Sequence, residues 1–206
     1  MKLVEKIVKY MEAKNYQLAK GTGEKNIIYI EGMNADGTLN ADTPNHFNDL
    51  RLLLVFDKGV PTIEAAWEAT TEPGYYYTDN PMNPKGAARI AFGQYQAWQV
   101  GLHGYSHPHE ALIQVGPVRV HRDWNRDMMR TGDAIDEGYF GINQHWGHNH
   151  PKNDIYTAGA GCLVCRLCEE HIDFMYLVKS DIRYKLDKNF VYPTTIIPGD
   201  KLFAVR

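Results

Sequence analysis

Three cysteines and a histidine recur at intervals of three residues near the end of the chain. They are Cys162, Cys165, Cys168 and His171, in the segment TAGAGCLVCRLCEEH (157–171), and the chain has no other cysteine. Thiolates and imidazoles bind zinc, and thiolates also hold iron–sulfur clusters, so the pattern is compatible with a metal clamp. A thiolate is also a nucleophile, so one cysteine could instead attack a substrate while the other two pack as small buried side chains.

The spacing argues against the metal clamp. On a continuous helix, residues repeated every three positions form a slowly winding stripe that is too spread to close a tetrahedron. A second Cys pair in a distant loop would strengthen the metal interpretation, and the sequence has none. We therefore predict no metal and no other cofactor, and a packing role for Cys165 and Cys168.

The nucleophile interpretation centres on Cys162. This residue follows Gly159, Ala160 and Gly161, and such small residues can leave backbone N–H groups exposed as an oxyanion hole. A thiol attacks as the thiolate, so it needs a base. His145 ends the strand-like run GYFGINQH (138–145), and we expect it to meet Cys162 at one rim, within residues 138–180.

Two histidine clusters provide an alternative. A catalytic zinc is commonly held by three protein ligands, and histidine is a frequent one. The loops that carry these histidines also contain Asn and Pro, so solvated side chains are the other interpretation. The two clusters are His103, His107 and His109, and His145, His148 and His150.

The segment DWNRD (123–127) resembles the first half of a calcium loop, because Asp123, Asn125 and Asp127 alternate. Met128 stands where such a loop needs glycine, and no glutamate occupies the twelfth position. A turn closed by Asp and Asn side chains is therefore preferred over a calcium site.

The pattern of the remaining chain indicates a β-rich α+β fold. Apolar residues recur at helical spacing in an N-terminal helical segment (1–20), with the helix ending near Lys14, and a second helix is predicted over 169–179. Short strand-like runs alternate with turn residues, and no linker or repeat divides residues 1–206, which we treat as one domain. The predicted strands cover 26–30, 51–56, 61–70, 97–102, 110–116, 117–122, 138–145 and 201–205.

Charge and hydropathy limit the partners. The net charge is −3 and no basic run is present, so nucleic acid is not an expected partner. No apolar stretch is long enough for membrane insertion, and the first residues do not form a signal peptide. We therefore expect synthesis in a cytoplasm, where three clustered cysteines stay reduced.

The His-loop-Cys arrangement resembles the L,D-transpeptidase (YkuD-like) family of cell-wall enzymes. In that family a strand ends in His-Gly, and a loop then leads to Ser-His-Gly-Cys; here GINQHWG (141–147) leads to GAGC (159–162). Trp146 separates the histidine from its glycine, and Gly159 and Ala160 replace Ser and His. The segments EGMNADGT, FNDLR, EATTEPGYYYTDNPMNPKG and AGC also resemble a divergent phage and bacterial branch.

The resemblance implies a sandwich of sheets with an added N-terminal helix, and a cysteine enzyme acting on peptidoglycan stem peptides. Cys162 would be the nucleophile, His145 its base and Gly161 part of the oxyanion hole. Substrate contacts are expected from Trp146, from Arg166, which replaces an arginine common in the motif, and from Tyr76 in the tyrosine-rich loop 71–86.

The polar loops favour a wet cleft and hence hydrolysis by a phage-type endolysin, which acts on the wall after lysis or virion delivery. The alternatives are a transpeptidase proper, a zinc-dependent wall hydrolase, and a non-catalytic wall-binding or virion module.

Overall fold

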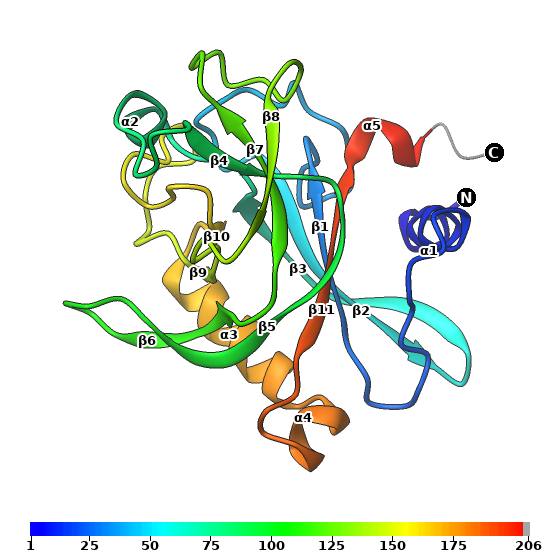
Figure 1. Cartoon of the computed structure of the whole chain (residues 1–206). Coiled ribbons are helices and arrows are strands. Elements are labelled where there is room, and N and C mark those ends of the chain that lie inside the picture. The colour runs from blue at the N-terminus through cyan, green and yellow to red at the C-terminus, as the bar shows by residue number, and fades with distance from the viewer. Residues whose placement is uncertain (204–206) are drawn as a thin grey trace.

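The chain forms a closed barrel with a smaller sheet beside it (Figure 1). The structure is a computed structural model that describes residues 1–203. Around the barrel the strand order is β1-β11-β5-β6-β9-β10-β3-β2, and the second sheet has the order β4-β7-β8.

The strand bounds follow the chain. The barrel contains β1 (Asn26–Glu31), β2 (Asp49–Asp57), β3 (Val60–Thr70), β5 (Gly93–His103), β6 (His109–Gln114), β9 (Gln144–Trp146), β10 (Leu163–Cys165) and β11 (Tyr192–Pro198). The second sheet contains β4 (Ala87–Ile90), β7 (Val118–Asp123) and β8 (Ala134–Gly138). The helices are α1 (Leu3–Ala13), α2 (Tyr75–Asp79), α3 (Cys168–Lys179), α4 (Ile182–Leu186) and α5 (Gly199–Leu202).

The predicted β-rich class is confirmed, but the larger sheet closes on itself instead of forming one half of a sandwich. Strand β11 makes the closure, because it runs parallel to β1 and antiparallel to β5. It thereby joins the first strand of the chain to the middle of the sheet. Closure leaves no unpaired sheet edge in the barrel.

Successive side chains of β1 point to opposite faces of the sheet, so this strand is buried on both its inner and its outer surface. Ile27 and Tyr29 belong to the central core, together with Trp98 and Leu163. Ile28 and Ile30 face the other way and form a second core.

Helix α1 covers this second core. Ile7 and Met11 are fully buried against it, as the helical spacing of apolar residues in this segment predicts. The helix ends at Ala13, before the left-handed residue Asn15, so it is shorter than the segment 1–20 assigned to it. No helix within residues 1–203 is both long and apolar enough to span a membrane.

The smaller sheet shares the central core. Ala88, Ile90, Val118 and Val120 of β4 and β7 join the cluster formed by the barrel interior, and Phe174 of α3 joins it as well. The sheet and barrel therefore form a single hydrophobic unit. This common core holds β4 against the segment that carries Cys162.

Two predicted elements are wrong in part. The expected strand 201–205 is replaced by helix α5 as far as Leu202, and residues 204–206 lie outside the described part. The expected strand 138–145 is reduced to β9, because Gly138 ends β8 and Gly141 adopts a positive φ of 72° that interrupts extended structure.

Candidate active site

A cleft of about 620 Å³ lies between the barrel and the smaller sheet, and both Cys162 and His145 line it. Its walls combine imidazole, phenol and small apolar groups, with Met82 and Tyr139 exposed on the rim. The other lining residues are Tyr77, Asn83, Gly86, Ala87, Ala88, His103, Arg122, Phe140, Gly141, Ile142, His148, Thr157, Ala158 and Ala160.

The register of β9 and β10 places the cysteine and the histidine on the same face. The two strands are parallel neighbours, with His145 opposite Val164. Paired residues of parallel strands point to the same side, and so do residues two apart in one extended segment. Cys162 precedes Val164 by two residues, and therefore shares the face of His145.

Gln144 confirms which face this is. Its side chain lies inside the barrel, where its amide donates to Thr194 Oγ1 at 2.9 Å and accepts from the Tyr29 hydroxyl at 3.3 Å. Because successive strand residues alternate, His145 points out of the barrel interior and into the cleft.

A backbone carbonyl orients the His145 ring. Nδ1 lies 2.8 Å from the Trp146 carbonyl oxygen, to which it donates in the neutral tautomer, and this leaves Nε2 with a free lone pair. The residue is only 4% exposed. Burial, followed by the neighbouring His103, lowers the pKa of His145 to about 3.

The Cys162 thiol is also neutral at rest. Burial raises its pKa to about 11, although the Asn143 N–H, at 3.4 Å from Sγ, opposes the shift. Sγ lies 3.5 Å from the Gly141 carbonyl oxygen, to which its S–H donates. Within residues 1–203 no hydrogen bond joins Sγ to His145, so the two groups share a cleft without forming a preformed ion pair.

Gly161 allows the chain to enter β10 where no other residue would fit. Its φ is +122°, and a side chain there would collide with the Ala88 carbonyl oxygen of β4. In the described part of the chain the N–H of Cys162 donates no hydrogen bond. An N–H without an acceptor can stabilise the oxyanion that forms when the sulfur of the same residue attacks a carbonyl.

Two residues without a predicted role in the dyad contact its members, His103 at His145 and Asn143 at Cys162. His103, at the end of β5, stacks on His145 with ring centroids 4.0 Å apart. The Asn143 side-chain amide lies 2.9 Å from His103 Nδ1 and accepts from the Gln114 N–H at 2.8 Å. Asn143 could have been suspected from its position two residues before His145, whereas His103 lies on a distant strand.

The three predicted substrate residues lie outside the lining of the cleft. Tyr76 is exposed on α2 and packs edge-on against Tyr77, which does line the cleft. Trp146 stacks on His109 at 3.7 Å, and Arg166 forms an ion pair with Glu68 at 2.7 Å.

Within residues 1–203, Cys162, Cys165, Cys168 and His171 do not come together as the ligands of one metal site. Cys165 is buried in the core with Sγ 3.8 Å from Glu170 Oε2, while Cys168 begins α3. Among the described residues, three ligating atoms come within 4.8 Å of one another only at Glu31, Asp42 and Glu72, and neither histidine cluster does so.

The segment 123–127 forms the turn that was preferred over a calcium loop. Asp123 accepts the N–H groups of Asp127 and Met128 at 3.1 and 3.0 Å, and Asp127 accepts that of Met129 at 2.7 Å. Asn125 donates its side-chain amide to Asp127 at 2.7 Å. These bonds satisfy the side chains locally.

Comparisons with protein-family models, with curated proteins and with solved structures gave no match.

Proposed function

We propose that the protein is a cysteine enzyme that hydrolyses peptide bonds in the stem peptides of peptidoglycan. One observation carries the proposal: Cys162, directly before β10, and His145, on the adjacent parallel strand β9, line one cleft. The free N–H of Cys162 and the resemblance of its sequence motif to L,D-transpeptidases support the same chemistry.

The reaction begins with a neutral thiol and a neutral imidazole. Nε2 of His145 takes the proton as Sγ attacks the substrate carbonyl, so positive charge on the ring develops together with negative charge on the oxyanion. The N–H of Cys162 donates to that oxyanion. When the C–N bond breaks, His145 returns the proton to the leaving amine, and a thioester of Cys162 remains.

Water then resolves the thioester. His145 accepts a proton from the attacking water and delivers it to the departing sulfur, which regenerates the thiol and releases a carboxylic acid. The exposed rim residues Met82 and Tyr139 are consistent with a cleft that admits water. Resolution by an amine would make the same site a transpeptidase.

A non-catalytic wall-binding module is the second candidate. The raised pKa of Cys162 and the lack of a hydrogen bond from its sulfur to His145 favour it, because an activated thiol is usually held as a thiolate by a cationic neighbour.

The test uses purified sacculi, and tetrapeptide muropeptides supplied with a D-amino acid. Hydrolysis predicts falling turbidity and new free amino groups without exchange of the D-amino acid. Mass spectrometry of rapidly quenched protein should show an acyl adduct on Cys162, and Cys162→Ala should be inactive with an unchanged fold.

Three other outcomes would redirect the proposal. Efficient exchange of the D-amino acid without loss of turbidity would establish the transpeptidase. Binding to sacculi without turnover would establish the wall-binding module. Turnover that survives in Cys162→Ala but stops with a zinc chelator would establish a metal-dependent hydrolase.

A further inference from the structure

A second pocket adjoins the candidate active site. It has a volume of about 550 Å³, within the range of small-ligand sites. Arg122 lines this pocket as well as the cleft that contains Cys162, so the two hollows meet at its side chain. The other residues that line it are Lys85, Trp124, Asn125, Gly132, Asp133, Ala134, Ile135 and Asp136.

The pocket has an aromatic wall that is unusually exposed. Trp124 follows β7 and is 77% exposed, and Ile135 of β8 is 55% exposed. An indole with a free face offers a large apolar surface on which the C–H face of a sugar ring can stack. A tryptophan serving only the core would be buried, as Trp98 is.

Two buried polar atoms in the lining have no hydrogen-bond partner. Nη2 of Arg122 is an unpaired donor, on a side chain that is only 4% exposed. Oδ2 of Asp133 is an unpaired acceptor. Buried polar groups are rarely left unpaired, so a rotation that turns these atoms toward a ligand offering both an acceptor and a donor would remove an energetic penalty.

The remaining contacts of Arg122 fix its position between the hollows. Nε pairs with Asp136 at 3.2 Å, and Asp136 also receives Lys85 at 3.3 Å. The guanidinium carbon lies 4.4 Å from the centre of the Phe140 ring, which lines the cleft. Arg122 is thus held in place while one of its donors remains free.

We propose that this pocket is a saccharide-binding subsite that holds a sugar of the glycan strand while the attached peptide enters the cleft. A sugar supplies the required chemistry, namely an apolar face for Trp124 and hydroxyl or acetamido groups for Arg122 and Asp133. The identity of the sugar as an amino sugar carrying a stem peptide rests on the proposed function.

The experiment measures binding of a β-1,4-linked N-acetylglucosamine tetramer, which has the sugar chemistry without any peptide, by calorimetry and by tryptophan fluorescence. Trp124→Ala should weaken binding about tenfold or more, Trp124→Phe should recover part of the affinity, and Asp133→Ala should weaken it less. The melting temperature should not change with Trp124→Ala, because that side chain is exposed.

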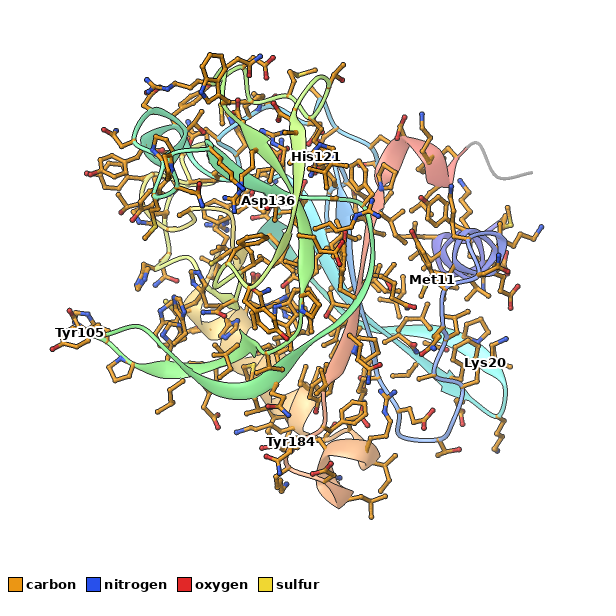
Figure 2. The ribbon with its side chains drawn as sticks, in the orientation of Figure 1. Met11, Lys20, Tyr105, His121, Asp136 and Tyr184 are labelled. Carbon is orange, nitrogen blue, oxygen red and sulfur yellow. The ribbon has the colours of Figure 1, made fainter. Side chains whose placement is uncertain are left out.

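Tyr105 provides the matched control. It is a fully exposed aromatic residue between β5 and β6, and Figure 2 shows it far from Asp136. Tyr105→Ala should bind the tetramer as the wild type does. Equal loss in Tyr105→Ala and Trp124→Ala would overturn the subsite, and so would the absence of any binding by the wild type at millimolar sugar.

Two further arms separate this inference from the proposed function. Cys162→Ala should bind the tetramer unchanged, so sugar binding by a protein that never cleaves sacculi would leave the subsite standing while the enzyme proposal fails. A sugar-free stem peptide should not lose affinity in Trp124→Ala, and a loss there would identify the pocket as a peptide site instead.

Discussion

His103 and His145 stack face to face in the cleft, with ring centroids 4.0 Å apart and planes inclined by 12°. Two imidazolium ions cannot be placed so close without strong repulsion, and burial disfavours even one of them. The pKa of each ring is lowered, chiefly by burial, and that of His145 reaches about 3. Burial, reinforced by the stacked His103, therefore keeps His145 unprotonated far into the acidic range, as its proposed role as a base requires.

The stack predicts an unusual pH dependence. An ordinary histidine base loses activity below a pKa near 6.5, whereas here kcat/KM should stay level on the acidic side down to about pH 5. His103→Ala removes a ring that excludes water from His145 and that also repels a second positive charge. The pKa of His145 should therefore rise toward 6.5. His103→Phe removes only the charge and should raise it less, because burial is the larger cause.

NMR titration of the His145 ring checks this without relying on activity. Wild-type resonances should not titrate between pH 5 and 8, and those of His103→Ala should. Titration of wild-type His145 near pH 6.5 would contradict the role assigned to the stack.

Substitution of each of the three cysteines should have a different effect on activity and stability. Cys162→Ala should abolish turnover with little change in melting temperature. Cys165 is fully buried, so Cys165→Ala should lower the free energy of unfolding by about 1–2 kcal/mol and keep activity. Cys168→Ala should retain both, because this side chain is only partly buried. Equal loss of folding and activity in all three would instead support a shared metal.

The pKa of the Cys162 thiol gives this prediction an independent readout. Because burial raises that pKa to about 11, alkylation by iodoacetamide in the absence of substrate should accelerate about tenfold per pH unit from pH 7 to 10. A rate that levels off near neutral pH would reveal a stabilised thiolate.

The sequence was sufficient where the site is local. His145 and Cys162 belong to two segments joined by one loop, so their meeting followed from a strand, a loop and a glycine-cysteine turn. Gly161 was recognisable for the same reason, since its small size affects the backbone directly before Cys162.

Pairing between strands that are far apart in the sequence could not be predicted from the residue pattern. Strand β11 closes the barrel through partners on β1 and β5, and nothing in YPTTIIP indicates that closure. His103 reaches His145 only because β6 lies between β5 and β9 in the sheet. Trp146 and Arg166 were expected to contact the substrate, yet Trp146 stacks on His109 and Arg166 pairs with Glu68.

Gly161→Ala should lower the free energy of unfolding by more than the strain of a positive φ alone explains. Strain in the left-handed region costs about 1–2 kcal/mol, and the new methyl group would also collide with the Ala88 carbonyl oxygen. Gly59→Ala is the control, because Gly59 has a φ of +82° and an open surrounding. Urea unfolding should show the smaller loss for Gly59→Ala and at least twice that loss for Gly161→Ala. Similar losses would mean that β4 yields and that the contact with Ala88 does not fix the position of Cys162.

Arg130 balances a buried group of carboxylates. Its guanidinium pairs with Glu31 through two hydrogen bonds and lies 3.9 Å from Glu72. Burial, followed by the charge of Glu31, raises the pKa of Asp42 to about 6 and that of Asp49 to about 8. The positive charge of Arg130 therefore does not fully offset the negative charges around it. Removal of this cation should destabilise the folded state strongly.

Arg130→Met should lower the free energy of unfolding at pH 7 by about 3–5 kcal/mol, because it leaves a buried carboxylate without its partner. The loss should shrink as the pH falls to 5, since raised pKa values allow the carboxyl groups to become neutral in the folded state. Glu31→Gln combined with Arg130→Met should recover part of the stability. Lys152→Met, which breaks the exposed pair with Glu68, should cost less than about 1 kcal/mol. Urea unfolding at both pH values measures all four proteins, and a loss in Arg130→Met no larger than in Lys152→Met would show that the buried charges need no compensation.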